Sequence, residues 1–154
     1  MMDTLKMDID ALLGERWFPK ETSFEEDITE YWGEWGVCSE VETLRAVLMR
    51  RPGKEVESFD PKAVRFSEPI DVELMRRQHD NVAKVYTDFG AKVYYVEHQL
   101  EDRPNAVFCR DLMFMTPEGA IITRPGMAAR RGEERYVAEA LAKIGVPILK
   151  TIAG

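Results

Sequence analysis

Basic residues are in the minority in this sequence, which has 21 lysines and arginines against 28 acidic residues and a formal net charge of −7. No basic run is longer than two residues. This composition argues against nucleic acids and anionic membranes as partners, although it does not argue against a small cationic ligand. Long apolar runs are absent as well, so we expect no segment that spans a bilayer.

Cysteine is scarce, because Cys38 and Cys109 are the only two in the 154 residues. Two cysteines are too few for a disulfide framework, so we expect free thiols in a reducing cytoplasm. The first 15 residues carry four acidic residues and one lysine, unlike the basic start of signal and transit peptides. His79 and His98 lie far from either cysteine along the sequence, and no glycine-rich nucleotide loop occurs. We therefore expect neither a metal nor a cofactor.

Apolar residues make up 45% of the sequence, which is enough for the core of one domain. We expect residues 1–36 to form a helical extension, whose second helix starts with a capping box at Ser23 and Glu26. Over residues 37–154, apolar periodicity and Gly/Pro breaks predict an α/β domain. Its expected helices span 71–89 and 133–144, and its expected strands span 44–50, 92–97, 106–115, 120–124 and 147–152.

Asp111 draws attention because the expected strand places it between Phe108 and Phe114. A carboxylate in an apolar strand is costly unless it meets a cation or several hydrogen-bond donors. One explanation is a structural ion pair with Arg110 or another local arginine, and such pairs are common. The other is a planar ligand cation with two parallel N–H groups, such as a guanidinium. The residues alone leave both explanations open.

An ordered motif precedes a hairpin and an arginine-rich turn that opens a helix, and its residues are Pro104, Asn105, Phe108, Arg110 and Asp111. This order resembles the guanidino-group-modifying superfamily, which includes arginine deiminases, dimethylarginine dimethylaminohydrolases and amidinotransferases. The likeness covers most of the chain and is most specific over residues 104–133. It implies the pentein fold, an α/β propeller of five ββαβ modules, of which this chain would supply about the first two to two and a half.

The resemblance also implies a role for each residue. Asp111 matches the catalytic carboxylate that clamps the substrate guanidinium, and the adjacent Arg110 is expected to take part in substrate binding. Phe108 matches an aromatic ring next to the guanidinium plane. Asn105 and Arg130 match residues that hold the substrate α-carboxylate in deiminases, a task for which a forked guanidinium is well suited. The dimethylarginine enzymes usually carry acidic residues in place of Asn105 and Arg110. Arg110 followed by Asp111 instead resembles deiminases and amidinotransferases, and Asn105 favours a deiminase-type hydrolase.

Two chemical groups of the superfamily are not matched in this sequence. In these enzymes a cysteine thiolate attacks the guanidinium carbon and a histidine shuttles protons, and both come from the C-terminal half. We therefore expect this chain to be inactive alone and to need that half, as a second chain or a missing segment. Strand alternation would put Cys109 on the same face as Asp111, but small buried cysteines are usually inert.

The expected function is the substrate-binding half of a C–N hydrolase that acts on arginine or a related guanidino compound. The alternatives are an amidinotransferase, in which an amine resolves the adduct, and a non-catalytic ligand-binding or assembly subunit. The complete enzyme is expected to be a homo-oligomer. Because a partial propeller leaves strand edges uncovered, we expect the chain to be stable only with a partner that carries the remaining modules.

Overall fold

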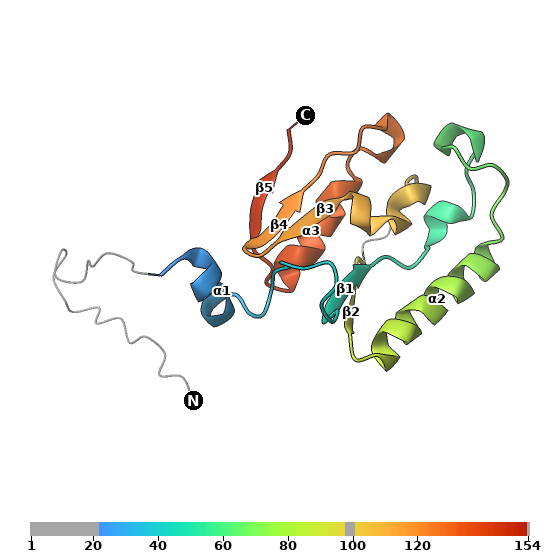
Figure 1. Ribbon diagram of the computed structural model, residues 1–154. Helices are drawn as coiled ribbons and strands as arrows, with labels where there is room; N and C mark the ends of the chain where they lie inside the picture. The colour runs from blue at the N-terminus through green and yellow to red at the C-terminus, as the bar shows by residue number, and fades with distance from the viewer. Residues whose placement is uncertain (1–21, 98–100, 154) are drawn as a thin grey trace.

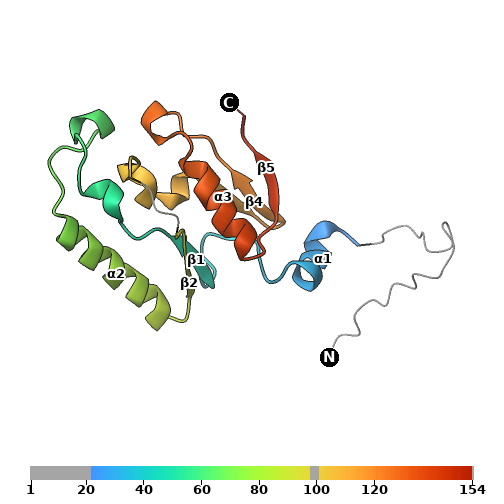
Figure 2. The ribbon, with the colours of Figure 1, turned by 180° about the vertical axis from the view of Figure 1, so that it is seen from behind.

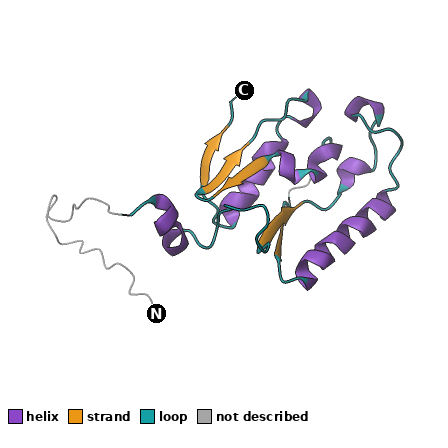
Figure 3. Ribbon diagram, viewed as in Figure 1, coloured by secondary structure: helices purple, strands orange, loops and turns teal. Residues whose placement is uncertain are grey.

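The computed structural model describes residues 22–97 and 101–153 (Figure 1). These residues form α-helices and short strands, and the strands make up two small sheets (Figure 3). The first expected helix of the N-terminal extension and His98 lie outside the described residues. No helix in the described part is long and apolar enough to cross a membrane.

The first sheet belongs to a βαβ unit. Its strands β1 (Ala46–Met49) and β2 (Lys92–Tyr95) run parallel and are joined through α2 (Val72–Asp88). The Asp71 side chain caps α2 by accepting a hydrogen bond from the Leu74 backbone N–H at 2.9 Å. All three elements confirm the predicted strand, helix and strand, with slightly shorter bounds.

The second sheet belongs to a ββαβ unit. Strand β3 (Met113–Thr116) pairs antiparallel with β4 (Gly119–Ile122), and β5 (Ile148–Thr151) pairs parallel with β4. Helix α3 (Glu133–Lys143) connects β4 to β5 and covers one face of this sheet, as opposite views show (Figure 1, Figure 2). The main core cluster joins α3 to the sheet and includes Leu112, Ala120, Ile122, Val137 and Leu141.

The mixed α/β architecture confirms the α/β part of the predicted fold class. The unit β3–β4–α3–β5 has the strand and helix order of the expected ββαβ module. The unit β1–α2–β2 has one strand fewer within the described residues. The described chain thus contains one ββαβ unit and one βαβ unit.

Helix α1 (Phe24–Tyr31) begins with the predicted capping box. The Ser23 hydroxyl accepts a hydrogen bond from the Glu26 backbone N–H at 3.2 Å, and the Glu26 carboxylate accepts one from the Ser23 N–H at 2.6 Å. In the segment after α1, the centre of the Trp35 ring lies 5.8 Å from the centre of the Tyr94 ring, and Trp35 packs against the core. This aromatic contact attaches the segment after α1 to the α/β domain.

The predicted strand over residues 106–115 is wrong in its first part. Residues Pro104–Val107 and Cys109–Asp111 form two 3₁₀ turns, and β3 starts only at Met113. The buried residues of this segment include Ala106, Cys109 and Leu112, with exposures of 2%, 5% and 1%. Their spacing of three matches a 3₁₀ turn and not the alternation of a strand. Asp111 is consequently 48% exposed at its side chain, and not buried.

Candidate functional site

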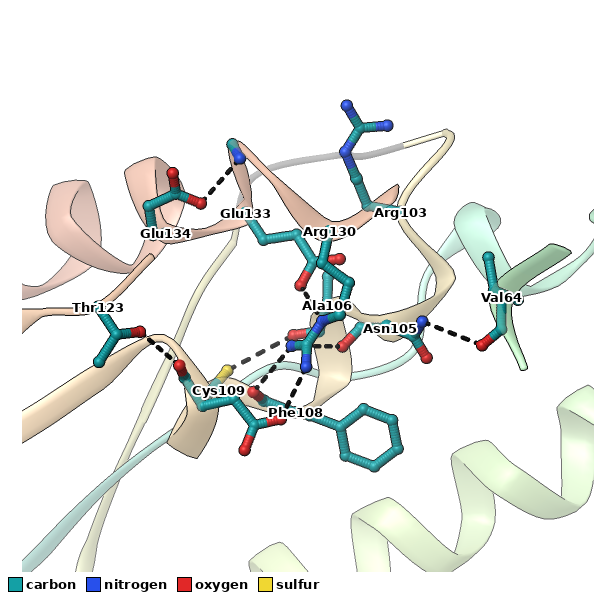
Figure 4. Close-up of polar contacts among 12 residues, drawn as sticks. Val64, Arg103, Asn105, Ala106, Phe108, Cys109, Thr123, Arg130, Glu133 and Glu134 are labelled. Carbon is teal, nitrogen blue, oxygen red and sulfur yellow. Dashed lines mark hydrogen bonds and ion pairs between the residues drawn. The ribbon is translucent and has the colours of Figure 1, made fainter. Parts of the chain in front are cut away.

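Arg130 lies at the centre of the candidate site. It is the last residue of a 3₁₀ turn, Ala128–Arg130, just before α3, and its side chain is 12% exposed. Its Nη1 donates to Asp111 Oδ2 at 2.7 Å, and its Nε donates to Glu133 Oε2 at 2.9 Å (Figure 4). One guanidinium therefore bridges two carboxylates that come from different parts of the chain.

The same guanidinium also holds the backbone of the preceding loop. Arg130 Nη2 donates to the carbonyl oxygens of Asn105 and Phe108, each at 3.3 Å. Burial alone would lower the pKa of Arg130, but its hydrogen bonds to Asp111 and Glu133 outweigh burial and raise it. Arg130 is thus a permanent cation that fastens residues 105–111 to the start of α3.

Phe108 lies beside this cation. The Arg130 Cζ atom is 5.9 Å from the centre of the Phe108 ring, within cation–π range, and Phe108 is 45% exposed. The aromatic neighbour expected for a substrate guanidinium therefore contacts a guanidinium of the chain itself. Together, Asp111 and Phe108 form a carboxylate and a ring face that accommodate a flat cation.

Asp111 makes the structural ion pair that the sequence left open, and its partner is Arg130, not the adjacent Arg110. Only one carboxylate oxygen, Oδ2, is engaged by Arg130. The Asp111 backbone carbonyl accepts a hydrogen bond from the Thr123 hydroxyl, which ties the turn to the segment after β4. Arg110 itself is exposed. The ion pair explains how the chain tolerates the carboxylate, yet it leaves Asp111 at the surface.

Asn105 meets Arg130 through its backbone and not through its amide. Its side chain is buried, and Nδ2 donates to the Val64 carbonyl oxygen at 3.4 Å, so the amide points away from Arg130 (Figure 4). The loop that contains Val64 is thereby connected to the site. The structure brings Asn105, Phe108, Asp111 and Arg130 together, with Asn105 in a supporting position.

Cys109 does not share a face with Asp111, contrary to the expectation from strand alternation. It is 5% exposed, and its thiol lies 3.7 Å from the Ala106 carbonyl oxygen. Burial raises the pKa of this thiol to about 11, which disfavours the reactive thiolate at neutral pH. The inert, packed role expected of a small buried cysteine fits this environment.

Glu133 is a component of the site that sequence reasoning missed. It is the first residue of α3 and only 1% exposed, and burial raises the pKa of its carboxyl against the opposing effect of Arg130. Its Oε1 atom is buried without a hydrogen-bond partner among the described residues. The available signal was the Arg130-x-x-Glu133 spacing, which puts two opposite charges one turn apart at a helix start.

Two cavities in the described part of the chain lie away from these residues. One, of about 150 Å³, is lined by Trp35, Met113 and neighbours of β1. The other, of about 290 Å³, lies between β2 and α3 beside Tyr95 and Tyr136. Asp111, Phe108 and Arg130 line neither of these two cavities, and the Asp111 carboxylate and the Phe108 ring are each about half exposed.

Among curated proteins, the chain is similar to arginine deiminases. The deiminase of Pediococcus pentosaceus is 35% identical over 69 residues, which cover 43% of this chain and 17% of the relative. A deiminase of Staphylococcus aureus is 36% identical over 64 residues, or 40% of this chain and 16% of the relative. The matched segments are thus a small part of each relative.

Among solved structures, the chain resembles dimethylarginine dimethylaminohydrolases. A mutant of DDAH from Pseudomonas aeruginosa complexed with citrulline has a TM-score of 0.58 and 22% identity, over 73% of this chain and 43% of that one. A dimethylarginine dimethylaminohydrolase adduct with 4-chloro-2-hydroxymethylpyridine gives a TM-score of 0.57 at 22% identity, over 72% and 42% of the two chains. These likenesses show the fold, and this chain spans less than half of either structure.

The family described as N,N dimethylarginine dimethylhydrolase, eukaryotic, matches residues 52–153. This range includes the whole motif segment, α2 and the ββαβ unit. The predicted resemblance to the guanidino-modifying superfamily is confirmed. Because the match extends over more than half of the sequence, the chain belongs to the N,N-dimethylarginine dimethylhydrolase family of that superfamily.

Proposed function

We propose that this chain provides the guanidinium-binding part of a cysteine-dependent hydrolase that acts on arginine or a related guanidino compound. The observation that carries the proposal is the pair Asp111 and Phe108, which already hold a guanidinium, that of Arg130. A carboxylate and an aromatic face that accept one guanidinium can accept another of the same shape and charge.

Ligand binding would exchange this internal contact for an external one. Asp111 is half exposed and Arg130 engages only its Oδ2, so a ligand can approach from the solvent side. A substrate guanidinium would bind both oxygens in the bidentate manner that this cation prefers. Arg130 Nη1, released from Asp111, would then be available for the ligand carboxylate.

The proposed reaction class is C–N hydrolysis. The similar proteins support this choice over amidinotransfer, because their names describe a deiminase and a dimethylaminohydrolase. The family match supports an N-methylated arginine as substrate, whereas Asn105 and Arg110 favour arginine itself. The nucleophile and the proton shuttle are proposed to lie in the remaining modules, since the burial of Cys109 disfavours its thiolate. We call the chain together with those modules the assembled protein.

Calorimetry on the assembled protein tests the proposal. Arginine and asymmetric dimethylarginine are titrated separately into the parent protein and into Asp111→Asn, which preserves shape but removes the charge. We expect the parent to bind at least one of them and the variant to lose most of that affinity. The control is Glu118→Gln, an exposed carboxylate on the β3–β4 turn, which should bind like the parent.

The result separates the candidate functions. Binding of one compound that survives in Glu118→Gln and fails in Asp111→Asn identifies the substrate class. If the parent binds neither compound, the chain is a non-catalytic assembly subunit and the proposal is wrong. Equal binding by the parent and by Asp111→Asn would show that the ligand does not bind at this carboxylate.

A further inference from the structure

Glu133 is a buried carboxylate whose hydrogen-bonding capacity is only partly used. Its side chain is 1% exposed, and its Oε2 accepts from Arg130 Nε at 2.9 Å. Its Oε1 is buried and has no hydrogen-bond partner among the described residues. A half-satisfied buried carboxylate is costly. The hydrogen bond to Arg130 is therefore the contact that the charge of Glu133 serves.

The contacts of Arg130 divide into an inner side and an exposed side. On the inner side, Nε is held by the buried Glu133, and Nη2 is held by the carbonyl oxygens of buried Asn105 and half-exposed Phe108. On the exposed side, Nη1 contacts Asp111, whose side chain is 48% exposed. If the Asp111 contact is given up to a ligand, the other three contacts remain and still define the plane of the guanidinium.

We propose that Glu133 is a positioning residue that keeps the Nη1 edge of Arg130 facing the ligand site when Asp111 changes partner. This inference rests on the proposed function of Asp111 as the guanidinium-binding carboxylate. In the free chain the charges alternate as Asp111, Arg130 and Glu133. With ligand bound they alternate again as Asp111, ligand guanidinium, ligand carboxylate, Arg130 and Glu133, so Arg130 is never left beside another cation or without an anion.

With Arg130 positioned in this way, the site requires more of its ligand than a guanidinium group. The positioned Nη1 edge recognises a carboxylate on the same molecule, at the other end of a short aliphatic chain. Glu133 should therefore matter for arginine and should not matter for agmatine, which has the same guanidinium and chain but lacks the carboxylate. A purely structural role would affect both compounds alike.

The test measures dissociation constants of arginine and agmatine by calorimetry for the assembled parent protein, Glu133→Gln and Glu133→Asp. We expect Glu133→Gln to weaken arginine binding about tenfold, because a charge-assisted hydrogen bond is replaced by a neutral one. Agmatine binding should stay unchanged. Glu133→Asp keeps the charge, so it should recover part of the arginine affinity. It also serves as the second variant if Glu133→Gln fails to fold.

The matched control is Glu134→Gln, one residue further along α3, whose carboxylate accepts from the Gly132 backbone N–H and does not contact Arg130. It should bind both compounds like the parent. Equal weakening of arginine and agmatine in the Glu133 variants, or no weakening of arginine, overturns the positioning role. Failure of the parent to bind either compound would instead refute the proposed function on which the inference rests.

Discussion

At the scale of single residues, Arg130 determines how the candidate site is built. Its planar fork donates to two carboxylates and two backbone carbonyls at the same time. A lysine ammonium is a single point with three donors and cannot reach four acceptors in these directions. The residue is therefore needed for its shape as well as for its charge.

Replacement of Arg130 by lysine should destabilise the fold. We expect Arg130→Lys to lower the free energy of unfolding by about 1–3 kcal/mol, because buried acceptors lose their partners and Glu133 keeps a poorer one. Urea denaturation of the parent and the variant measures the difference. Arg131→Lys, the same change at the exposed neighbouring residue, should leave stability nearly unchanged. Equal stabilities of the two variants would contradict the bridging role of Arg130.

The two cysteines should differ sharply in reactivity. Cys38 is exposed, whereas Cys109 is buried and has a pKa of about 11, so at pH 8 Cys109 forms almost no thiolate. We expect one thiol to react quickly with a thiol-specific reagent in the native protein and both to react after denaturation. Cys38→Ser should abolish the fast reaction. A fast native reaction that persists in Cys38→Ser would show that Cys109 is accessible.

At the scale of elements, the β3–β4 hairpin depends on one glycine. Gly119 has a φ of 140°, and a Cβ atom there would lie 2.5 Å from the Pro147 carbonyl oxygen at the entry to β5. This close approach lets the Ala120 N–H donate to the same carbonyl at 2.8 Å. The pairing of β4 with β5 thus requires the absence of a side chain at residue 119.

Gly119→Ala should therefore destabilise the ββαβ unit. We expect a loss of about 1–3 kcal/mol in the free energy of unfolding, from backbone strain and from displacement of the segment before β5. Thermal or urea denaturation provides the measurement. Gly126→Ala is the matched control, since a Cβ atom added at Gly126 would meet nothing within 4 Å. Similar losses in both variants would mean that the approach of Pro147 is not what constrains Gly119.

At the scale of the whole molecule, the chain spans less than half of the solved structures that it resembles. Large apolar side chains are exposed on it, including Phe89 at 85% and Phe114 at 64%. Strands β2 and β5 each pair on one side only within the described sheets. The requirement for a partner that carries the remaining modules stays a prediction, and these surfaces are where such a partner would be expected to pack.

The stability of the folded chain should depend on pH through His79, a residue of α2 whose ring lies beside β2. Its side chain is 8% exposed and its ring lies 6.3 Å from that of Tyr95. Burial lowers its pKa from the ordinary 6.5, Asp80 opposes this shift, and Arg51 adds to it. A histidine whose pKa is lower in the folded state takes up protons more readily when unfolded. His79 therefore reduces stability as the pH falls below about 7.

Urea denaturation between pH 7.5 and pH 5 measures this effect. We expect the free energy of unfolding to fall over this range in the parent and to fall less in His79→Gln, which cannot be protonated. His98 and the carboxylates are common to both proteins and cancel in the comparison. Parallel pH profiles for parent and variant would show that His79 is not the titrating group.

Much of the outline of this protein followed from the sequence itself, because apolar periodicity, capping boxes and glycine breaks act over a few neighbouring residues. Such local signals indicated α1, α2 and α3 and the strands near residues 46, 92, 120 and 148, and the ordered motif indicated the superfamily. They failed at residues 106–112, where burial falls at every third residue and not at every second residue as in a strand. Only the tertiary structure decided that Asp111 is half exposed and paired with Arg130, and that the Asn105 amide points to Val64. Those contacts join residues that the packing of α3 against its sheet brings together, so no local pattern could specify them.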